Sequence, residues 1–399
     1  MANTTSADPA ARPFARSWDA RSLRRPAIIV VLLALVLFAI PALVSLYYVD
    51  AGTQVAVYAI VALGLNLLVG RVGLVSLGQA AVLAMGAWVA ARLLFATSLP
   101  FEVVLLITGS ITMVLGTLVG LPALRMSGLY LALITLMLAG AITVVLATIN
   151  FPNGGHGFSG YNGGLLHLPA IRRPGIATTD TGFYRYSVIF AAIMFVVVLV
   201  HVRTRPGRAW AAIRQSESAA LAAGINITLY KMWAFALASF ITGVAGALLA
   251  GADRFLYSIN FATQDSITIL AVVLMGGIFS LWGAIIAALL MQLLPALLNS
   301  WGVSPDWLII LFGIGVLQVL TTAPAGLIDQ VPRDIRRLGG LIRRTFGSAS
   351  AARAVSPAGE SSPAPAGDTG STDHGVGAGG AAVQVSAPAQ AGRGAGDPE

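Results

Sequence analysis

The sequence contains no cysteine and only one lysine, Lys231, among its 399 residues. Without cysteine, disulfide bonds, thiolate catalysis, cysteine-bound zinc and iron–sulfur clusters are all excluded. A phosphate-binding P-loop needs the pattern Gly-x-x-x-x-Gly-Lys-Ser/Thr, in which the lysine reaches the terminal phosphates. Lys231 lies between Tyr230 and Met232 and does not fit that pattern. The chain is therefore not a nucleotide-hydrolysing subunit of the P-loop class.

Histidine and charged residues are scarce as well. The four histidines lie far apart in the sequence, so we predict no metal site, and no pattern of residues predicts a catalytic site. Charged residues make up 10% of the chain, against roughly 25% in a typical soluble domain. Apolar residues make up 57%, and the mean hydropathy is +0.84. So few charges could not cover the surface of this chain in water, and the composition predicts a membrane protein.

Ten apolar runs are candidates for membrane-spanning helices, each of which needs about 20 residues. The clear runs, followed by three less regular ones, are residues 27–48, 55–69, 101–123, 129–149, 184–202, 233–252 and 306–323, then 75–95, 266–279 and 281–298. We therefore predict an all-α polytopic membrane protein with about ten transmembrane helices, some of them short or broken by glycine. The first run is too long for a signal peptide and lacks a clear cleavage site, so we interpret it as an anchor.

Composition divides the chain into four predicted parts. Residues 1–26 form a polar N-terminal segment, and residues 27–330 form the transmembrane domain. A basic juxtamembrane segment follows at 331–345, and the tail at 346–399 is rich in alanine, glycine, proline and serine. Because the tail has no apolar periodicity, it cannot bury enough surface to offset its chain entropy, and we predict that it is disordered.

The distribution of arginine predicts the orientation of the chain, because lysine and arginine collect in cytoplasmic segments. With the N-terminus inside the cell, 19 of the 24 basic residues lie in cytoplasmic segments and five lie outside. The five outside residues are Arg92, Arg172, Arg173, Arg185 and Arg254. We therefore predict that both termini are cytoplasmic and that a glycine-rich loop at about 150–183 is extracytoplasmic.

No charged residue lies in the middle of a predicted span. This absence disfavours a proton-coupled carrier and an intramembrane hydrolase, although a sodium site built from backbone carbonyls would not need such residues. Asn66 and Gln79 are candidate polar residues of a transport pathway, and interhelical hydrogen bonding is the alternative role for both.

Small residues recur at helical spacing in several spans. Ser239, Gly243 and Ala247 lie four residues apart and predict a smooth helix face for close packing. Further candidates for helix packing or gating are Gly78, Gly86, Gly276, Gly277 and Gly283.

A polar segment at about 203–232 joins two predicted spans on the cytoplasmic side. Pro206 and Gly207 interrupt the preceding span, residues 208–223 favour a helix, and Gly224 is typical of a helix end. This helix is too polar to cross a membrane and too apolar for a solvated linker. We predict that it docks against another protein, and packing on the membrane surface is the alternative.

Several stretches of the chain resemble the permease subunits of branched-chain amino-acid ABC importers, the LivM type in particular. In order, they are "GLNLLVGRVGLVSLGQAAVLAMGAW" (64–88), "LRMSGLYLALITLMLAG" (124–140), the glycine-rich loop, "RPGRAWAAIRQSESAALAAGINITLYKMWAFALASFITGVAGALLA" (205–250), "LAVVLMGGIFSLWGAIIAALL" (270–290) and "APAGL" (323–327). The resemblance covers most of residues 27–330 and neither terminal segment.

The resemblance implies a non-enzymatic permease subunit that forms a translocation pathway by alternating access in the bacterial cytoplasmic membrane. The implied partners are a homologous, LivH-like permease subunit, two cytoplasmic ATPase subunits, an extracytoplasmic substrate-binding protein and membrane lipid, with no nucleic acid. ATP and Mg²⁺ would bind to the ATPase subunits, and this chain would bind no cofactor. Urea and short-chain amide permeases share the pattern, and a self-contained carrier or channel is a further hypothesis.

Importer permeases of this kind carry a cytoplasmic Glu-Ala-Ala-x-x-x-Gly loop that docks into a groove on the ATPase. In this chain Ser218 stands at the glutamate position, and Glu217 lies one residue earlier. The resemblance implies that Ala219 and Ala220 face the groove. The residues implied in ATPase coupling are Arg208, Glu217, Ser218, Ala219, Ala220 and Gly224.

Overall fold

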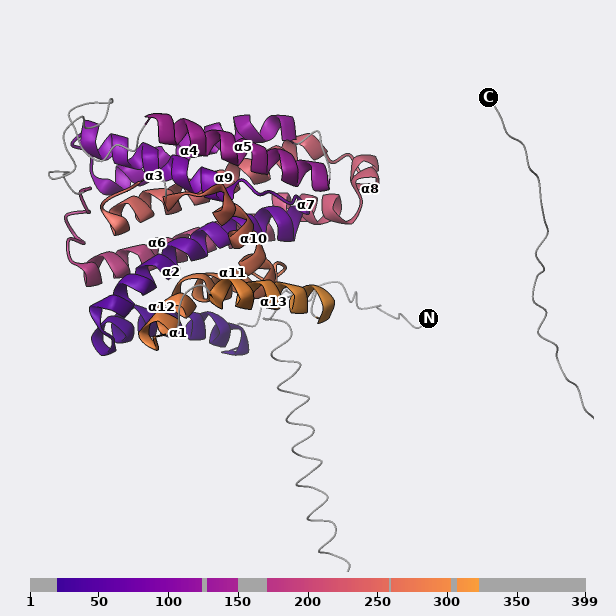
Figure 1. The fold of residues 1–399 in the computed structure, drawn as a ribbon. Coiled ribbons are helices and arrows are strands. Elements are labelled where there is room, and N and C mark those ends of the chain that lie inside the picture. Colours follow the sequence, from indigo (N-terminus) through magenta and orange to yellow (C-terminus); the bar gives the residue numbers. More distant parts are fainter. Residues whose placement is uncertain (1–19, 124–127, 150–170, 258–259, 303–306, 323–399) are drawn as a thin grey trace, which may run out of the picture. The chain divides into compact units, whose positions relative to one another are not determined.

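The computed structural model describes residues 20–123, 128–149, 171–257, 260–302 and 307–322. Every regular element among these residues is a helix, in agreement with the predicted all-α class (Figure 1). The predicted tail, the basic juxtamembrane segment and residues 150–170 of the predicted outer loop lie outside the described residues. The division into four parts therefore stays a prediction.

The helices follow the predicted apolar runs closely. In chain order they are α1 (Ala20–Leu43), α2 (Leu46–Leu65), η1 (Asn66–Val72), α3 (Gln79–Ala96), α4 (Phe101–Ala123), α5 (Leu129–Ile149), α6 (Asp180–Arg203), α7 (Arg205–Gln215), α8 (Glu217–Ala222), α9 (Ile227–Asp253), α10 (Thr263–Gly277), α11 (Leu281–Ala288), η4 (Leu289–Leu293), α12 (Leu294–Ser300) and α13 (Trp307–Thr322). Both α4 and α5 begin and end where the sequence predicts.

Seven helical segments of the described chain are long and apolar enough to cross a membrane. They are Leu46–Val72, Gln79–Ala96, Phe101–Leu118, Tyr130–Ile149, Asp180–Arg203, Ile227–Asp253 and Leu281–Ser300. The apolar part of α1 and the whole of α10 are apolar but shorter than a full span. The chain is therefore a polytopic membrane protein, and the count of ten crossings and the orientation of the termini stay predictions.

The boundary between the first two helices differs from the prediction. Residues 49–54 form a polar break in the sequence, but they lie inside α2, which begins at Leu46. Their polar side chains find partners: Thr53 Oγ1 donates to the Val49 carbonyl at 3.0 Å, and Gln54 Nε2 donates to Asp253 Oδ1 of α9 at 2.6 Å. A polar stretch stays helical here because its side chains are hydrogen-bonded.

Two π-helical segments interrupt the α-helices. The first, η1, continues α2 without a break and ends before Gly73, which has a left-handed φ of 85°. The second, η4, separates α11 from α12 within the single predicted run 281–298. π-Helical turns are rare and occur often at functional sites.

The central element is α9, which makes its most extensive contacts with α4, α3 and α2. The most apolar stretch of α9 is 94% buried within the chain, against 22% for α5. The interior of the bundle is therefore built around α9, whereas α5 offers most of its apolar surface to lipid or to another subunit.

Small residues allow α9 to lie very close to its neighbours. A Cβ atom on Gly86 of α3 would lie 2.7 Å from the carbonyl oxygen of Gly243. A Cβ on Gly243 would in turn overlap the side chain of Thr112 in α4. One turn away, the Ser239 side chain occupies the space beside Gly116, and Ala247 is fully buried. The small-residue face of α9 thus lies at the contact with α3 and α4, and a role in gating stays a prediction.

Candidate functional site

The connection between α6 and α9 consists of α7 and α8, which lie together at one end of the described helices (Figure 1). α7 begins after Thr204, and Pro206 occupies its first turn, where the missing N–H costs no hydrogen bond. Trp210 is fully buried, and its Nε1 donates to the Tyr230 carbonyl at 2.9 Å. The indole therefore anchors α7 against the first turn of α9.

Arg214 attaches α7 to the ends of the transmembrane helices. Its Nη1 donates to the Gly70 carbonyl of η1 at 2.8 Å. The guanidinium also lies over the Phe279 ring, 4.3 Å from its centroid, in the turn between α10 and α11. One side chain thus connects the polar segment with the end of the α2–η1 span and with the turn that joins α10 and α11.

The helix predicted over residues 208–223 is wrong as a single element, because the chain breaks at Ser216. The backbone of Ser216 is extended, with φ −162° and ψ 119°, and its Oγ accepts from the Ala219 N–H at 3.3 Å. Serine competes with helical hydrogen bonding through such local contacts and is favoured as an N-cap. α7 and α8 are therefore two helices joined at a serine cap.

Gly224 lies at the end of α8, where the sequence places a helix stop. Its φ is 77°, in the left-handed region. The Gly224 N–H donates to the Leu221 carbonyl at 2.9 Å and the Ile225 N–H to the Ala220 carbonyl at 3.0 Å, which is the Schellman pattern. No atom lies within 4 Å of a Cβ built there, so the backbone conformation and not packing opposes a side chain at this position.

The two alanines of the predicted docking motif point in different directions. Ala220 is only 3% exposed, so the prediction that it faces a partner together with Ala219 is wrong. Consecutive residues of a helix are about 100° apart, and a single groove cannot receive both side chains equally. Ser218 and Ala219 are exposed on α8 and remain available for contact.

Glu217 forms an ion pair with the only lysine of the chain. Lys231 Nζ lies 2.7 Å from Glu217 Oε1, and the two side chains are 6% and 53% exposed. The pair joins the first residue of α8 to the second turn of α9. Glu217 therefore holds α8 in place within this chain, and its predicted role in ATPase coupling stays a prediction.

Replacing Glu217 with glutamine is expected to lower the stability of the purified chain by about 1 to 2 kcal/mol. The buried ammonium of Lys231 would lose its counter-charge, whereas solvent still screens the exposed side of the pair. The double variant Glu217→Gln/Lys231→Met should recover most of the loss, because it removes both charges. Thermal unfolding in detergent checks both, and a single variant as stable as the parent would contradict the role of the pair.

Asn66 and Gln79, the candidate pathway residues, both form interhelical hydrogen bonds. Asn66 is fully buried, and its Nδ2 donates to the Ser280 carbonyl at 2.8 Å and the Gly277 carbonyl at 3.3 Å. Gln79 Oε1 accepts from Thr242 Oγ1 of α9 at 2.9 Å. Asn66 thus connects η1 to the same turn that Arg214 contacts through Phe279. A direct role in the pathway stays a prediction for both residues.

Gly78 and Gln79 border a small internal space between α3, α4, α5 and α9. Its volume is about 30 Å³, and Ser76, Thr135 and Ser239 supply further polar groups. Such a space holds about two water molecules at most and is too small for an amino acid.

The glycines at the turn between α10 and α11 form a second close contact. A Cβ on Gly276 would overlap the Gly283 carbonyl, and one on Gly283 would overlap the Gly277 carbonyl. A Cβ on Gly70 of η1 would overlap the carbonyl of Ile278. The turn therefore packs directly against the end of the α2–η1 span.

Sequence reasoning missed the residues that join these elements. Arg214 and Gly70 are 144 positions apart, and no local pattern marks either as a partner of the other. The Ser216 cap carried a signal, because serine followed by glutamate is typical of a helix start. Among the described residues, no group of three or more histidine, aspartate and glutamate side chains is placed to hold a metal ion.

Comparison with known proteins assigns the family. The profile described as branched-chain amino acid transport system, permease component, matches residues 47–320. The high-affinity branched-chain amino acid transport system permease protein LivM of Escherichia coli is 30% identical over 340 residues, 81% of this chain and 79% of that protein. LivM of Salmonella typhimurium is 28% identical over 335 residues, 77% of each chain. No solved structure matches. The chain belongs to the family of permease components of branched-chain amino acid transport systems, which are non-enzymatic membrane subunits of ABC transporters.

Proposed function

We propose that this chain forms part of the translocation pathway of an ATP-driven importer for leucine, isoleucine and valine in the bacterial cytoplasmic membrane. The names of the two LivM relatives support this substrate class. The excess of arginine in the segments assigned to the inside supports a cytoplasmic location for both termini and for α7 and α8.

The importer would need several partners. A LivH-like permease would complete the membrane part, two ATPase subunits would bind ATP and Mg²⁺, and an extracytoplasmic protein would deliver the amino acid. The absence of a P-loop in this sequence supports the assignment of ATP hydrolysis to separate subunits.

The observation that carries the proposed mechanism is the contact of α7 with two transmembrane regions at once. Arg214 holds both the Gly70 carbonyl and the Phe279 ring, and Asn66 joins η1 to the same turn. A displacement of α7 and α8 by the ATPase subunits would therefore move the end of α2–η1 and the α10–α11 turn together. Alternating access would follow from that coupled movement.

Replacing Ala219 with tryptophan tests this function. Ala219 is exposed on α8, so a large side chain should leave the fold intact while blocking close approach of an ATPase subunit. We expect loss of ATPase co-purification and at least about a tenfold loss of ATP-driven leucine uptake, because an overpacked contact costs about 1 to 3 kcal/mol.

Ile176→Trp is the matched control, because Ile176 is 82% exposed and lies outside α7 and α8. It should transport at the parental rate. If Ala219→Trp shows parental uptake and parental ATPase co-purification, α8 is not the docking element. Uptake by the purified chain alone would instead favour a self-contained carrier.

Truncation after Ser348 is expected to leave uptake unchanged. The family match ends at residue 320, and the removed segment is of low sequence complexity. The truncated chain would keep the cluster of arginines between 333 and 344 beside the membrane. Uptake should be measured at equal membrane abundance, and a loss at that abundance would assign a role to the tail.

A further inference from the structure

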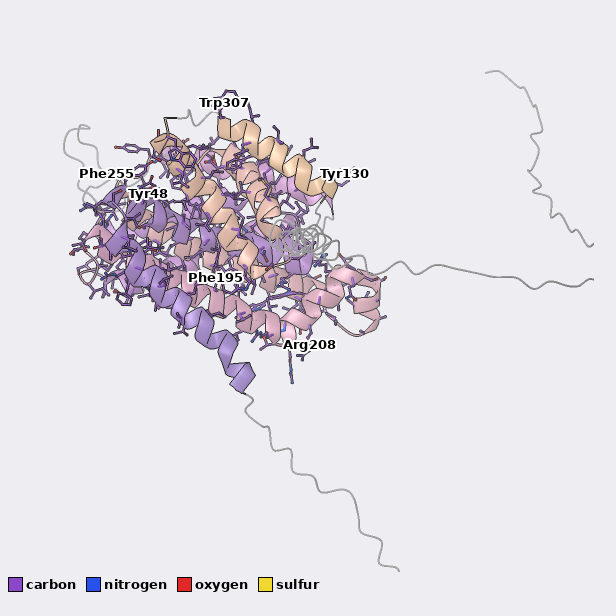
Figure 2. All side chains as sticks on the ribbon, turned by 90° about the horizontal axis from the view of Figure 1, so that it is seen from below. Tyr48, Tyr130, Phe195, Arg208, Phe255 and Trp307 are labelled. Carbon is purple, nitrogen blue, oxygen red and sulfur yellow. The ribbon has the colours of Figure 1, made fainter. Side chains whose placement is uncertain are left out.

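An open cleft lies between α7 and the end of η1. Its volume is about 520 Å³, and it is distinct from the exposed face of α8 that carries Ala219. Arg208 lines this cleft, and Figure 2 shows it at the margin of the described helices. The lining residues are Gly70, Arg71, Val202, Gly207, Arg208, Ala211, Arg214 and Gln215.

The cleft carries three positive charges and no negative one among its described lining residues. The Nε of Arg71 is buried and has no hydrogen-bond partner. Arg71 and Arg214 are also close enough to repel each other electrostatically. Buried or crowded guanidinium groups are normally paired with an anion, which relieves both the repulsion and the missing hydrogen bond.

The first turn of α7 adds to the attraction for an anion. Gly207 lies in this turn and lines the cleft. Thr204, the N-cap, does not cap the turn with its side chain, and its hydroxyl donates to the His201 carbonyl at 3.1 Å. The free N–H groups of a helix start favour negative charge. A Cβ on Gly207 would overlap the Val202 carbonyl, so glycine at this position allows α7 to pack against the end of α6.

The position of the cleft indicates the source of the anion. Arg71 lies one residue before the end of the candidate span Leu46–Val72, and Val202 one residue before the end of Asp180–Arg203. The ends of two spans place the cleft at the depth of the lipid headgroups, where arginine side chains meet phosphate.

We propose that this cleft binds the phosphate group of an anionic phospholipid. Arg71 and Arg208 hold the phosphate, and Val202 contacts the start of an acyl chain. The negative charge of the phosphate reduces the electrostatic repulsion between Arg71 and Arg214. The bound lipid therefore strengthens the attachment of α7 to η1. The occupied cleft thus favours the arrangement in which α7 and the transmembrane helices move together.

Native mass spectrometry of the full-length chain in detergent tests the proposal by titration with phosphatidylglycerol, with phosphatidylcholine and with inorganic phosphate. We expect retention of phosphatidylglycerol over phosphatidylcholine, and no competition by inorganic phosphate. Arg208→Gln and Arg71→Gln should each weaken phosphatidylglycerol binding about tenfold, because each removes a charge-assisted hydrogen bond. Arg208 is exposed, so its replacement tests the cleft without disturbing the fold.

Arg203→Gln is the matched control, since Arg203 is exposed at the end of α6 and does not line the cleft. It should weaken binding less than about fivefold, as expected of an exposed charge. An equal loss in Arg203→Gln would overturn the cleft as the binding site. Competition by inorganic phosphate, or equal retention of both lipids, would overturn the lipid assignment. If Arg208→Gln retains phosphatidylglycerol as the parent does but loses a co-purified protein, the cleft is a protein contact instead.

Discussion

Replacing Gly243 with leucine is expected to destabilise the chain by at least about 3 kcal/mol. Gly243 lies where α9 meets α3 and α4, and even a Cβ atom at this position would overlap the side chain of Thr112. The opposing surfaces cannot retreat easily, because the backbone of Gly86 lies against α9 on the other side. Leucine would therefore push apart the most buried helix of the bundle and its two main neighbours.

Gly313→Leu in α13 is the matched control for this change. Gly313 is exposed, and a Cβ built there meets no atom within 4 Å. The substitution improves helix propensity and should leave stability unchanged or slightly raised. Thermal unfolding of both variants in the same detergent provides the comparison. If Gly243→Leu unfolds at the same temperature as the parent chain, the contact of α9 with α3 and α4 can open to admit a side chain.

The apolar runs predicted most of the helices because a membrane span is encoded locally, by composition over about 20 residues. This is why α4 and α5 begin and end at the predicted residues. The prediction failed at residues 49–54, which lie between the predicted spans 27–48 and 55–69 but belong to α2. Gln54 stays in a helix because it bonds to Asp253, 199 positions away, and no local pattern contains that contact.

In the candidate site, too, the features that depend on one position could be predicted, and those that depend on contacts could not. The end of α8 at Gly224 was predictable, because a left-handed residue selects glycine at the position itself. The ion pair of Glu217 and Lys231 had a weaker signal, since the only lysine of the chain lies 14 residues from an isolated acid. The prediction that Ala220 is buried while Ala219 is exposed required the position of the Ser216 cap, which sets where α8 begins.

Replacing Arg214 with leucine is expected to lower ATP-driven leucine uptake more than tenfold while the ATPase subunits still bind. Leucine keeps part of the apolar contact of the side chain but loses the hydrogen bond to the Gly70 carbonyl and the interaction with the Phe279 ring. A hydrogen bond to a charged group contributes about 1.5 to 3 kcal/mol, and a cation–π contact about 0.5 to 1 kcal/mol. Their loss should detach α7 from η1 and from the α10–α11 turn.

The measurement compares uptake, ATP hydrolysis and ATPase co-purification in the same vesicles. Hydrolysis should continue in Arg214→Leu, because the proposed docking surface on α8 is unchanged, so the ratio of leucine transported to ATP hydrolysed should fall. Arg205→Leu is the matched control, since Arg205 is exposed on the same helix and its side chain makes no hydrogen bond or ion pair with the described residues. Parental uptake in Arg214→Leu would mean that movement reaches the transmembrane helices by another contact, of which the buried Trp210 against Tyr230 is the nearest.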